Sequence, residues 1–381
     1  MTMRVLLWAE VFWPHVGGGP QFSAELALAL HERGHEMLVV TRHDDPGLPH
    51  VESLHGIPVH RFPFHQCLSS GHIERLAELR HQIRELRGGF GADVVHTTSF
   101  GPSMLFQLDT SRAHPAPLLV TLLGEENPRG STSDTTLHRA LQAATWVTAP
   151  SEATLKYARE LVPTCRDRSC VVRVGTRRSR IEPNPMPDDP TLLCLGRLVR
   201  VKGFDLAVAA LPRILEGFPS ARLIIAGDGP ERGSLERKAR ELGVEAAVGF
   251  LGWVAPSDVP ALINAASILV MPSRAEAFPL AGLQAAFMAR PVVSTRVGGI
   301  PELVVDGETG LLVEADDCAG LADAILFLLD HPEEAERLGE AARQRSLKLF
   351  DFEQTADSYQ SLYRRVVADW RRHYQTTKGV D

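Results

Sequence analysis

The sequence predicts an α/β protein with two doubly wound domains, each built on a parallel sheet. Short apolar runs alternate with amphipathic segments along the chain, which is typical of parallel strands covered by helices on both faces. The segment EPNPMPDDP, residues 182–190, interrupts this alternation, because proline and clustered acids break both periodicities. The alternation then restarts, and 381 residues are enough for two domains of ~100–200 residues each. We therefore expect Rossmann-like domains at 1–183 and 190–351.

Apolar runs in the first half predict strands, and segments with a 3.6-residue period predict helices. The expected strands are 4–8, 37–41, 94–96, 118–121 and 146–148, and the expected helices are 21–33 and 73–86.

The second half repeats the pattern and ends in a long amphipathic helix. The expected strands are 192–195, 223–226, 248–251, 268–271 and 292–294, and the expected helices are 204–216, 231–242, 280–289, 321–330 and 352–374. Two doubly wound sheets that face each other leave a cleft at the carboxyl ends of their strands, where ligands of such folds bind.

Composition excludes several classes of protein. The net charge is −7, so nothing draws the whole chain toward nucleic acid. The five cysteines are scattered without metal-ligand or redox spacing, which favours reduced thiols. The chain runs directly into a strand without a leader segment, and no apolar run approaches the ~20 residues that span a bilayer. These observations predict a cytoplasmic protein.

The segment PSRAEAFPLAGLQAAFMARPVVSTRVGGIPE, residues 272–302, carries the strongest functional signal. It places one carboxylate, Glu276, on a short turn before a helix rich in small residues. The first turn of such a helix offers free N–H groups and a positive dipole end, which suit an anion such as a pyrophosphate. Backbone N–H groups around Phe278, Pro279 and Leu280 are therefore expected to face phosphates.

Two cations follow the first strand of the second half. Arg197 and Lys202 come after the run TLLCLG and before a helix. At an effective dielectric near 20, one cation ~4 Å from a phosphate contributes about 4 kcal/mol before desolvation costs. The alternative is a pair of solvated surface charges. Glu276 can accept hydrogen bonds from two sugar hydroxyls, worth ~1.5–3 kcal/mol each. Arg197, Lys202 and Glu276 together therefore indicate a nucleotide-sugar site. The alternative for Glu276 is an acid that complements the helix dipole.

These segments resemble a known family. The stretch PSRAEAFPLAGLQ…RPVVSTRVGGIPELVVDGETGLLV is similar to the donor-site signature of retaining glycosyltransferases with two Rossmann-like domains, the GT-B fold of the family 4 type. The pieces RVLLWAEVFWPHVGGGPQ, GRLVRVKGFDLAVAA, LIIAGDGPER and VGFLGWV extend the resemblance over nearly the whole chain. The family includes many bacterial mannosyl-, glucosyl- and N-acetylglucosaminyltransferases.

The resemblance implies an activity and a role for each of the two domains. A hexosyl group would move from a nucleotide-diphosphate sugar to a hydroxyl of a glycan, a lipid-linked compound or a small molecule. The acceptor would attack the face that the diphosphate leaves, and the leaving phosphate would take the proton. No cofactor is implied. The predicted site contains no DxD-like pair of acids, so a metal is not expected. The second domain would bind the donor, the first would face the acceptor, and the helix at 352–381 would pack back on the first.

Two further features are expected near the ligand. Gly17, Gly18 and Gly19 follow the first strand, where glycine lets backbone approach phosphate or acceptor; a plain strand-to-helix turn is the alternative. Trp253 follows the run VGFLG and is expected near the nucleotide base, or else in the core. No G-x-G-x-x-G follows the first strand, which argues against a dehydrogenase.

Two residues depart from the family pattern. Gln284 stands where a second glutamate is taken to hold the ribose, and the uncharged amide predicts a loss of ~1–2 kcal/mol in donor binding. Leu123 stands where many members have a histidine that contacts the sugar, and Glu125 and Glu126 are nearby carboxylates. These departures favour, as an alternative, a catalytically impaired member that binds a nucleotide sugar or glycan. An epimerase or phosphorylase on the same fold is a second alternative.

The acceptor side gives weaker signals. Residues 166–180 carry six arginines, which suit an anionic acceptor or simply form a solvated basic loop. The helix at 73–87 is amphipathic with four arginines and three glutamates, so peripheral contact with the inner membrane face competes with ordinary packing on the core.

Overall fold

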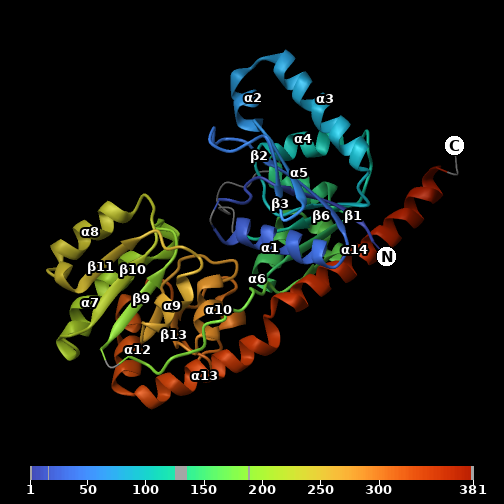
Figure 1. Ribbon diagram of the computed structural model, residues 1–381. Coiled ribbons are helices and arrows are strands. Elements are labelled where there is room, and N and C mark those ends of the chain that lie inside the picture. Colours follow the sequence, from blue (N-terminus) through green and yellow to red (C-terminus); the bar gives the residue numbers. More distant parts are fainter. Residues whose placement is uncertain (1, 16, 125–134, 188, 379–381) are drawn as a thin grey trace. The chain divides into compact units, whose positions relative to one another are not determined.

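The computed structural model describes residues 2–15, 17–124, 135–187 and 189–378 of the chain. They form two compact units: Met1–Val174 with Glu353–Asp381, and Gly175–Phe352 (Figure 1). Each unit contains one sheet with helices packed around it. The predicted α/β class with two doubly wound sheets is therefore confirmed.

In the first unit the described residues form an eight-stranded sheet in the order β3-β4-β2-β1-β5-β6-β7-β8. All neighbours are parallel except β3 and β4, which form an antiparallel hairpin that the sequence did not predict. The strands are β1 (Arg4–Ala9), β2 (Glu36–Arg42), β3 (Val51–Leu54), β4 (Ile57–Phe62), β5 (Val94–Thr97), β6 (Leu118–Thr121), β7 (Trp146–Ala149) and β8 (Ser169–Val171). The helices are α1 (Gly18–Glu32), α2 (Phe64–Ser70), α3 (Ile73–Phe90), α4 (Ser103–Thr110), α5 (Thr136–Ala143), α6 (Glu152–Leu161) and α14 (Phe352–Lys378).

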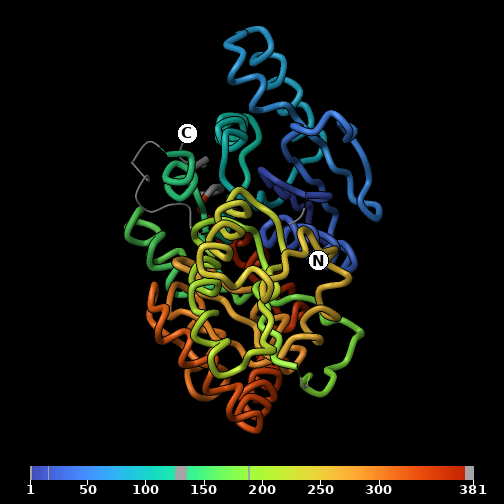
Figure 2. Tube along the Cα trace, turned by 90° about the vertical axis from the view of Figure 1, so that its left-hand side faces the viewer, coloured from blue at the N-terminus to red at the C-terminus, as the bar shows by residue number. Residues whose placement is uncertain are grey.

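The central strands of this sheet are buried along their length, as parallel strands between two helical layers must be. Both views show α2 and α3 projecting as an outlying pair of helices (Figures 1 and 2). Along α3 only Leu79, Ile83 and Arg87 are buried. The apolar side of the predicted basic helix therefore packs on its own domain.

The C-terminal helix α14 belongs to the first unit, as the resemblance implied. Its Tyr359 and Tyr363 are fully buried. The Tyr363 hydroxyl lies 2.6 Å from His96 Nδ1, and His96 Nε2 lies 2.7 Å from the Thr121 hydroxyl. Because His96 lies on β5 and Thr121 on β6, this hydrogen-bonded chain fixes the helix against the middle of the sheet.

The buried imidazole of His96 makes stability depend on pH. Burial lowers the pKa of His96 from 6.5 to about 3. Between pH 6.5 and 3 the imidazole therefore binds a proton in the unfolded chain but not in the folded chain. The contribution of neutral His96 to the free energy of unfolding is fully present above pH 6.5 and is lost as the pH falls toward 3. Between pH 6.5 and 5 we expect a loss of ~2 kcal/mol. Calorimetric scans at the two pH values should show this loss of stability in the native chain and a smaller loss in His96→Asn. Equal losses would contradict the view that His96 is the group responsible for the pH dependence.

In the second unit the described residues form a six-stranded, all-parallel sheet in the order β11-β10-β9-β12-β13-β14. The strands are β9 (Thr191–Leu195), β10 (Arg222–Ala226), β11 (Val248–Gly252), β12 (Ile268–Met271), β13 (Val292–Thr295) and β14 (Leu311–Val313). The helices are α7 (Phe204–Gly217), α8 (Arg232–Glu241), α9 (Val259–Asn264), α10 (Leu280–Phe287), α11 (Ile300–Leu303), α12 (Cys318–Asp330) and α13 (Pro332–Leu349).

The strand order locates the topological switch point of each sheet. From β9 the chain winds outward through β10 and β11, and then returns to place β12 on the other side of β9. The loops that leave β9 and β12 therefore diverge at a topological switch point, where folds of this kind bind ligands. In the first sheet the corresponding point lies between β1 and β5.

The boundary between the units lies earlier than the predicted linker. The second unit begins at Gly175, and the proline-rich segment is part of it. The reason is Arg290, whose buried guanidinium donates to the carbonyl oxygens of Asn184 (3.0 Å), Pro185 (3.2 Å) and Asn264 (2.7 Å). Segments that break periodicity are not necessarily linkers, since a buried donor can anchor their carbonyl groups.

Replacing Arg290 by Met should destabilise the protein by ~3 kcal/mol, because three carbonyl groups lose their buried donor. Urea unfolding of the full chain measures this. The matched control is Arg296→Met in the same unit, where the arginine is 42% exposed and pairs with Asp306 at 2.6 Å. We expect that change to cost less than about 0.5 kcal/mol. Equal losses in the two variants would contradict the anchoring role.

Candidate functional site

Two of the three residues expected to carry the chemistry meet at the switch point of the second unit. Lys202 Nζ donates to Glu276 Oε2 at 2.5 Å. Lys202 comes from the loop after β9 and Glu276 from the loop after β12. Their side chains are 28% and 14% exposed, so the ion pair is partly shielded from water but accessible to a ligand.

Close backbone packing brings these loops together. A Cβ atom at Gly203 would lie 1.9 Å from the carbonyl oxygen of Pro272, and Gly203 has a φ of +66°. Only glycine satisfies both conditions. The Arg274 N–H also donates to the Val201 carbonyl oxygen at 2.7 Å. Lys202 therefore sits beside a backbone contact that fixes its loop against the turn carrying Glu276.

Arg274, which was not predicted from the sequence, joins three loops of the site. Its guanidinium donates twice to Asp205 in α7, at 2.8 Å each, to Asp316 at 2.7 Å, and to the Arg200 carbonyl oxygen at 2.9 Å. Burial opposes ionisation of Asp205, but the hydrogen bonds from Arg274 hold the pKa of this carboxyl below its ordinary value. The same bonds with Asp205 raise the pKa of Arg274. The bidentate bonds make this a rigid link.

The first turn of α10 supplies free donors. Within α10, the first N–H group with a helical partner is that of Leu283, which donates to Pro279 O at 3.0 Å. The N–H groups of Leu280, Ala281 and Gly282 have no hydrogen-bond partner among the described residues. Pro279 itself has no N–H, so the donors lie slightly later than predicted. The Gly299 N–H donates to the Glu276 carbonyl oxygen at 2.8 Å, which holds the Gly-Gly turn against the Glu276 turn.

The other predicted residues of this unit occupy varied environments. Arg197 is exposed, and its side chain makes no hydrogen bond or ion pair with any residue that the structure describes. Phe278 is 7% exposed and packs on Phe350 with ring centroids 5.3 Å apart, so its side chain belongs to the core. Gln284 is half-buried in α10.

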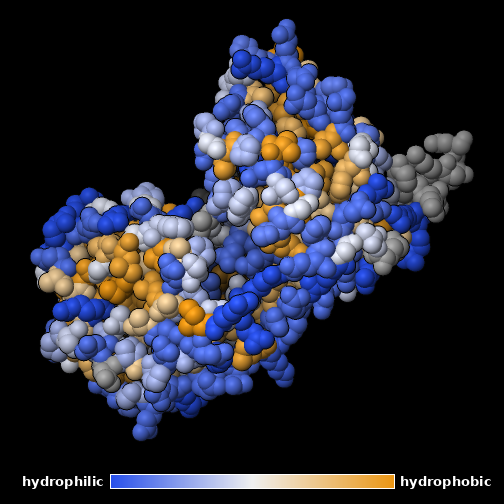
Figure 3. Space-filling view, viewed as in Figure 1, coloured by the Kyte–Doolittle hydropathy of each residue, from blue (hydrophilic) through white to orange (hydrophobic). Residues whose placement is uncertain are grey.

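Trp253 is 59% exposed after the edge strand β11, which excludes the core alternative. Hydrophobic residues gather on the surface over β10 and β11 (Figure 3), where Leu251 is also 52% exposed. The Trp253 side chain is therefore largely open to solvent, but it follows β11, which lies two strands from β9.

The remaining expected residues lie in the first unit. Gly17, Gly18 and Gly19 connect the loop after β1 to α1, which begins at Gly18. Leu123 is half-buried after β6. Glu125 and Glu126 lie outside the described residues.

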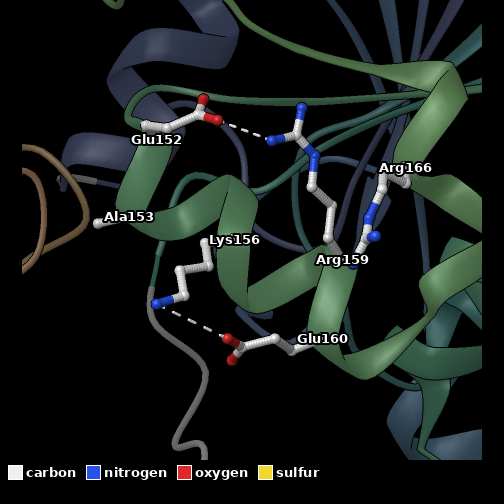
Figure 4. Close-up of a pocket in the computed structure, with 6 residues that line it drawn as sticks. All are labelled: Glu152, Ala153, Lys156, Arg159, Glu160 and Arg166. Carbon is white, nitrogen blue, oxygen red and sulfur yellow. Dashed lines mark hydrogen bonds and ion pairs between the residues drawn. The ribbon is translucent and has the colours of Figure 1, made fainter.

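Part of the arginine-rich segment lines a surface hollow of about 400 Å³, formed by Glu152, Ala153, Lys156, Arg159, Glu160 and Arg166 (Figure 4). Arg159 donates to Glu152 at 2.7 Å, and Lys156 lies 3.9 Å from Glu160. Arg168 instead donates to the carbonyl oxygens of Ala144, Leu141 and Gln142. The charges of Arg159 and Lys156 are therefore partly neutralised, and Arg168 has a structural role.

The described residues contain neither a metal-binding cluster nor a membrane-spanning helix. No group of three or more His, Cys, Asp or Glu side chains lies close enough to hold a metal ion. Likewise, none of the described helices combines the length and apolar composition required to cross a membrane.

Comparison with known proteins agrees with this architecture. Residues 17–175 match the model for a glycosyl transferase 4-like domain, and residues 176–345 match that for glycosyl transferases group 1. A glycogen synthase of Mycobacterium tuberculosis is 30% identical over 95% of this chain and 94% of its own length.

Two solved structures are similar over almost the entire chain. The sucrose-phosphate synthase from Thermosynechococcus elongatus has a TM-score of 0.82 at 25% identity, covering 96% of this chain and 100% of its own. HepE of Anabaena in complex with UDP-glucose has a TM-score of 0.78 at 21% identity, covering 94% and 100%. The switch-point site, the two matched domains and the full-length relative lead to one conclusion: this chain belongs to the group 1 glycosyltransferases of the family 4 type, with the GT-B fold.

Proposed function

We propose that the protein is a retaining, metal-independent hexosyltransferase that takes its sugar from a nucleotide-diphosphate donor and passes it to an acceptor hydroxyl. The observation that carries this proposal is the Lys202–Glu276 pair, 2.5 Å apart at the switch point of the second sheet. Lys202 and Arg197 would bind the diphosphate, and Glu276 would bind hydroxyls of the donor sugar.

The free donors of α10 support the same assignment. N–H groups of Leu280, Ala281 and Gly282 point out of the helix start, where the dipole is positive. Negative charge grows on the diphosphate as the glycosidic bond breaks, so fixed donors and cations stabilise the transition state more than the ground state. Charge stabilisation by the protein is the main catalytic term in this proposal, and no metal is required for it.

The donor can be identified by ligand-induced stabilisation. A nucleotide sugar at 100 times its dissociation constant should add about 2.7 kcal/mol to the free energy of unfolding. A thermal-shift screen of uridine, guanosine and adenosine diphosphate sugars should therefore give one preferred base. The similar structure of HepE is a complex with UDP-glucose, which makes uridine the first choice. NMR of the product anomer then tests retention; an inverted anomer would contradict the mechanism.

A second candidate is a member that binds donor without transferring it, favoured by Leu123 and Gln284 at the two altered positions. Calorimetric binding of a nucleotide diphosphate without nucleotide release, across a broad acceptor panel, would support this candidate. Product analysis with donor alone separates both from an epimerase or phosphorylase.

A further inference from the structure

A carboxylate and an imidazole meet at the switch point of the first unit. Glu10 directly follows β1, and its side chain is only 7% exposed. His65 lies in the first turn of α2 and is 50% exposed. The distance from His65 Nε2 to Glu10 Oε1 is 3.0 Å.

Glu10 is held from several elements. Its Oε2 accepts the Ser103 N–H at the start of α4, at 3.1 Å, and its own N–H donates to the Ser99 hydroxyl at 2.6 Å. A Cβ atom at Gly101 would lie 2.4 Å from Glu10 Cδ, so the loop after β5 closes tightly over the carboxylate. While the carboxylate keeps its bonds to Ser103 and His65, only a residue without a side chain fits at position 101.

This arrangement fixes the hydrogen of the imidazole. Both oxygens of the carboxylate accept, so the ring must present Nε2–H to Glu10, whether it is neutral or protonated. In the neutral ring Nδ1 then carries a lone pair. No described residue binds Nδ1, and half of the side chain is open to solvent. A buried carboxylate that orients a half-exposed imidazole is suited to binding a ligand through its other nitrogen.

We propose that His65 Nδ1 accepts a hydrogen bond from a hydroxyl of the acceptor, and that Glu10 is the positioning residue that keeps it an acceptor. The location supports this, because ligands bind at the carboxyl ends of strands near a switch point, and β1 and β5 diverge here. The inference rests on the proposed function for its substrate. The buried negative charge of Glu10 disfavours a phosphate at this position, so the class of acceptor is a neutral polyhydroxylated compound.

Two substitutions of His65 separate its two nitrogens. In His65→Gln the amide can still donate to Glu10 but offers no lone pair in place of Nδ1. In His65→Asn an oxygen lies near the former position of Nδ1, but the amide is too short to reach Glu10. With UDP-glucose as donor and maltotriose as acceptor, His65→Gln should raise the acceptor KM about tenfold. His65→Asn should raise it less. The donor KM should change less than about twofold in both.

Glu10→Gln provides a spectroscopic test of positioning. The amide must turn its oxygen to the Ser103 N–H and its NH2 to His65, which forces the hydrogen from Nε2 to Nδ1. Nitrogen-15 spectra of labelled imidazole should show the Nε2–H form in the native chain and the Nδ1–H form in the variant. A purely structural ion pair would not couple this change of tautomer to a higher KM for maltotriose.

The control is His81→Gln on α3, where His81 lies 3.3 Å from Glu85 and is 64% exposed. It should leave all these quantities unchanged. Titration with maltotriose should shift the Nδ1 resonance of His65, and D-inositol 3-phosphate should not. If no donor is turned over, the proposed function fails, and this titration still decides the inference. An unmoved Nδ1 resonance at saturating maltotriose, or an unchanged acceptor KM in His65→Gln, overturns it.

Discussion

Lys202→Ala is expected to lower kcat/KM for the donor by about 100-fold, the usual cost of removing one fixed donor to developing negative charge. Arg197→Ala should lower the rate by at least about tenfold, because it removes one cation from the diphosphate. The loss should be smaller than in Lys202→Ala, since Arg197 is exposed and its removal leaves the ion pair intact. Steady-state release of the nucleotide diphosphate measures both.

Lys156→Ala is the matched control. It removes a lysine that also faces a glutamate, Glu160 at 3.9 Å, but on α6 of the first unit. Its rate should match that of the native chain. Full activity in both Lys202→Ala and Arg197→Ala would remove the assignment of phosphate binding to these residues.

Arg274→Ala should lower donor kcat/KM by a similar amount, about 100-fold, although Arg274 acts only through its neighbours. It joins the loops after β9, β12 and β14 by bonds to Asp205, Asp316 and the Arg200 carbonyl group. Displacing reacting groups by about 1 Å costs on the order of 100-fold. Arg274→Lys should recover only part of the loss, because an ammonium group cannot reproduce the two parallel bonds to Asp205.

The comparison for this prediction is Arg213→Ala, which removes another arginine–aspartate pair of the same unit, that of Arg213 with Asp323. Both variants should remain folded at the assay temperature, although Arg274→Ala loses four hydrogen bonds and should unfold at the lower temperature of the two. Only Arg274→Ala should lose activity. Equal activities in the two variants would show that Arg274 does not position the site.

Most of the regular fold was predictable from sequence. The predicted strand 268–271 agrees with β12 because a fully buried parallel strand is a continuous apolar run. The hairpin of β3 and β4 was missed, since its partly exposed residues lack such a run. The predicted helix 280–289 ends two residues early at Phe287, because Ala289 adopts a φ of +51°.

The donor-side residues were predictable where chemistry is local, and missed where it depends on packing. Lys202 and Glu276 each follow an apolar strand, so their place at the sheet edge follows from the pattern. Arg274 and Asp205 are 69 residues apart, and only the order of the strands brings them together. The same holds for Glu10 and His65, which are 55 residues apart.

The central claim is that Lys202 and Glu276 bind different parts of one activated sugar, and calorimetric titration with UDP and with UDP-glucose tests it most directly. Lys202→Ala should weaken both ligands about equally, because both contain the diphosphate. Glu276→Gln should weaken UDP-glucose by about tenfold and leave UDP unchanged, because only the former carries the sugar hydroxyls. If Glu276→Gln changes the two affinities by the same factor, the carboxylate does not bind the sugar and the account is wrong.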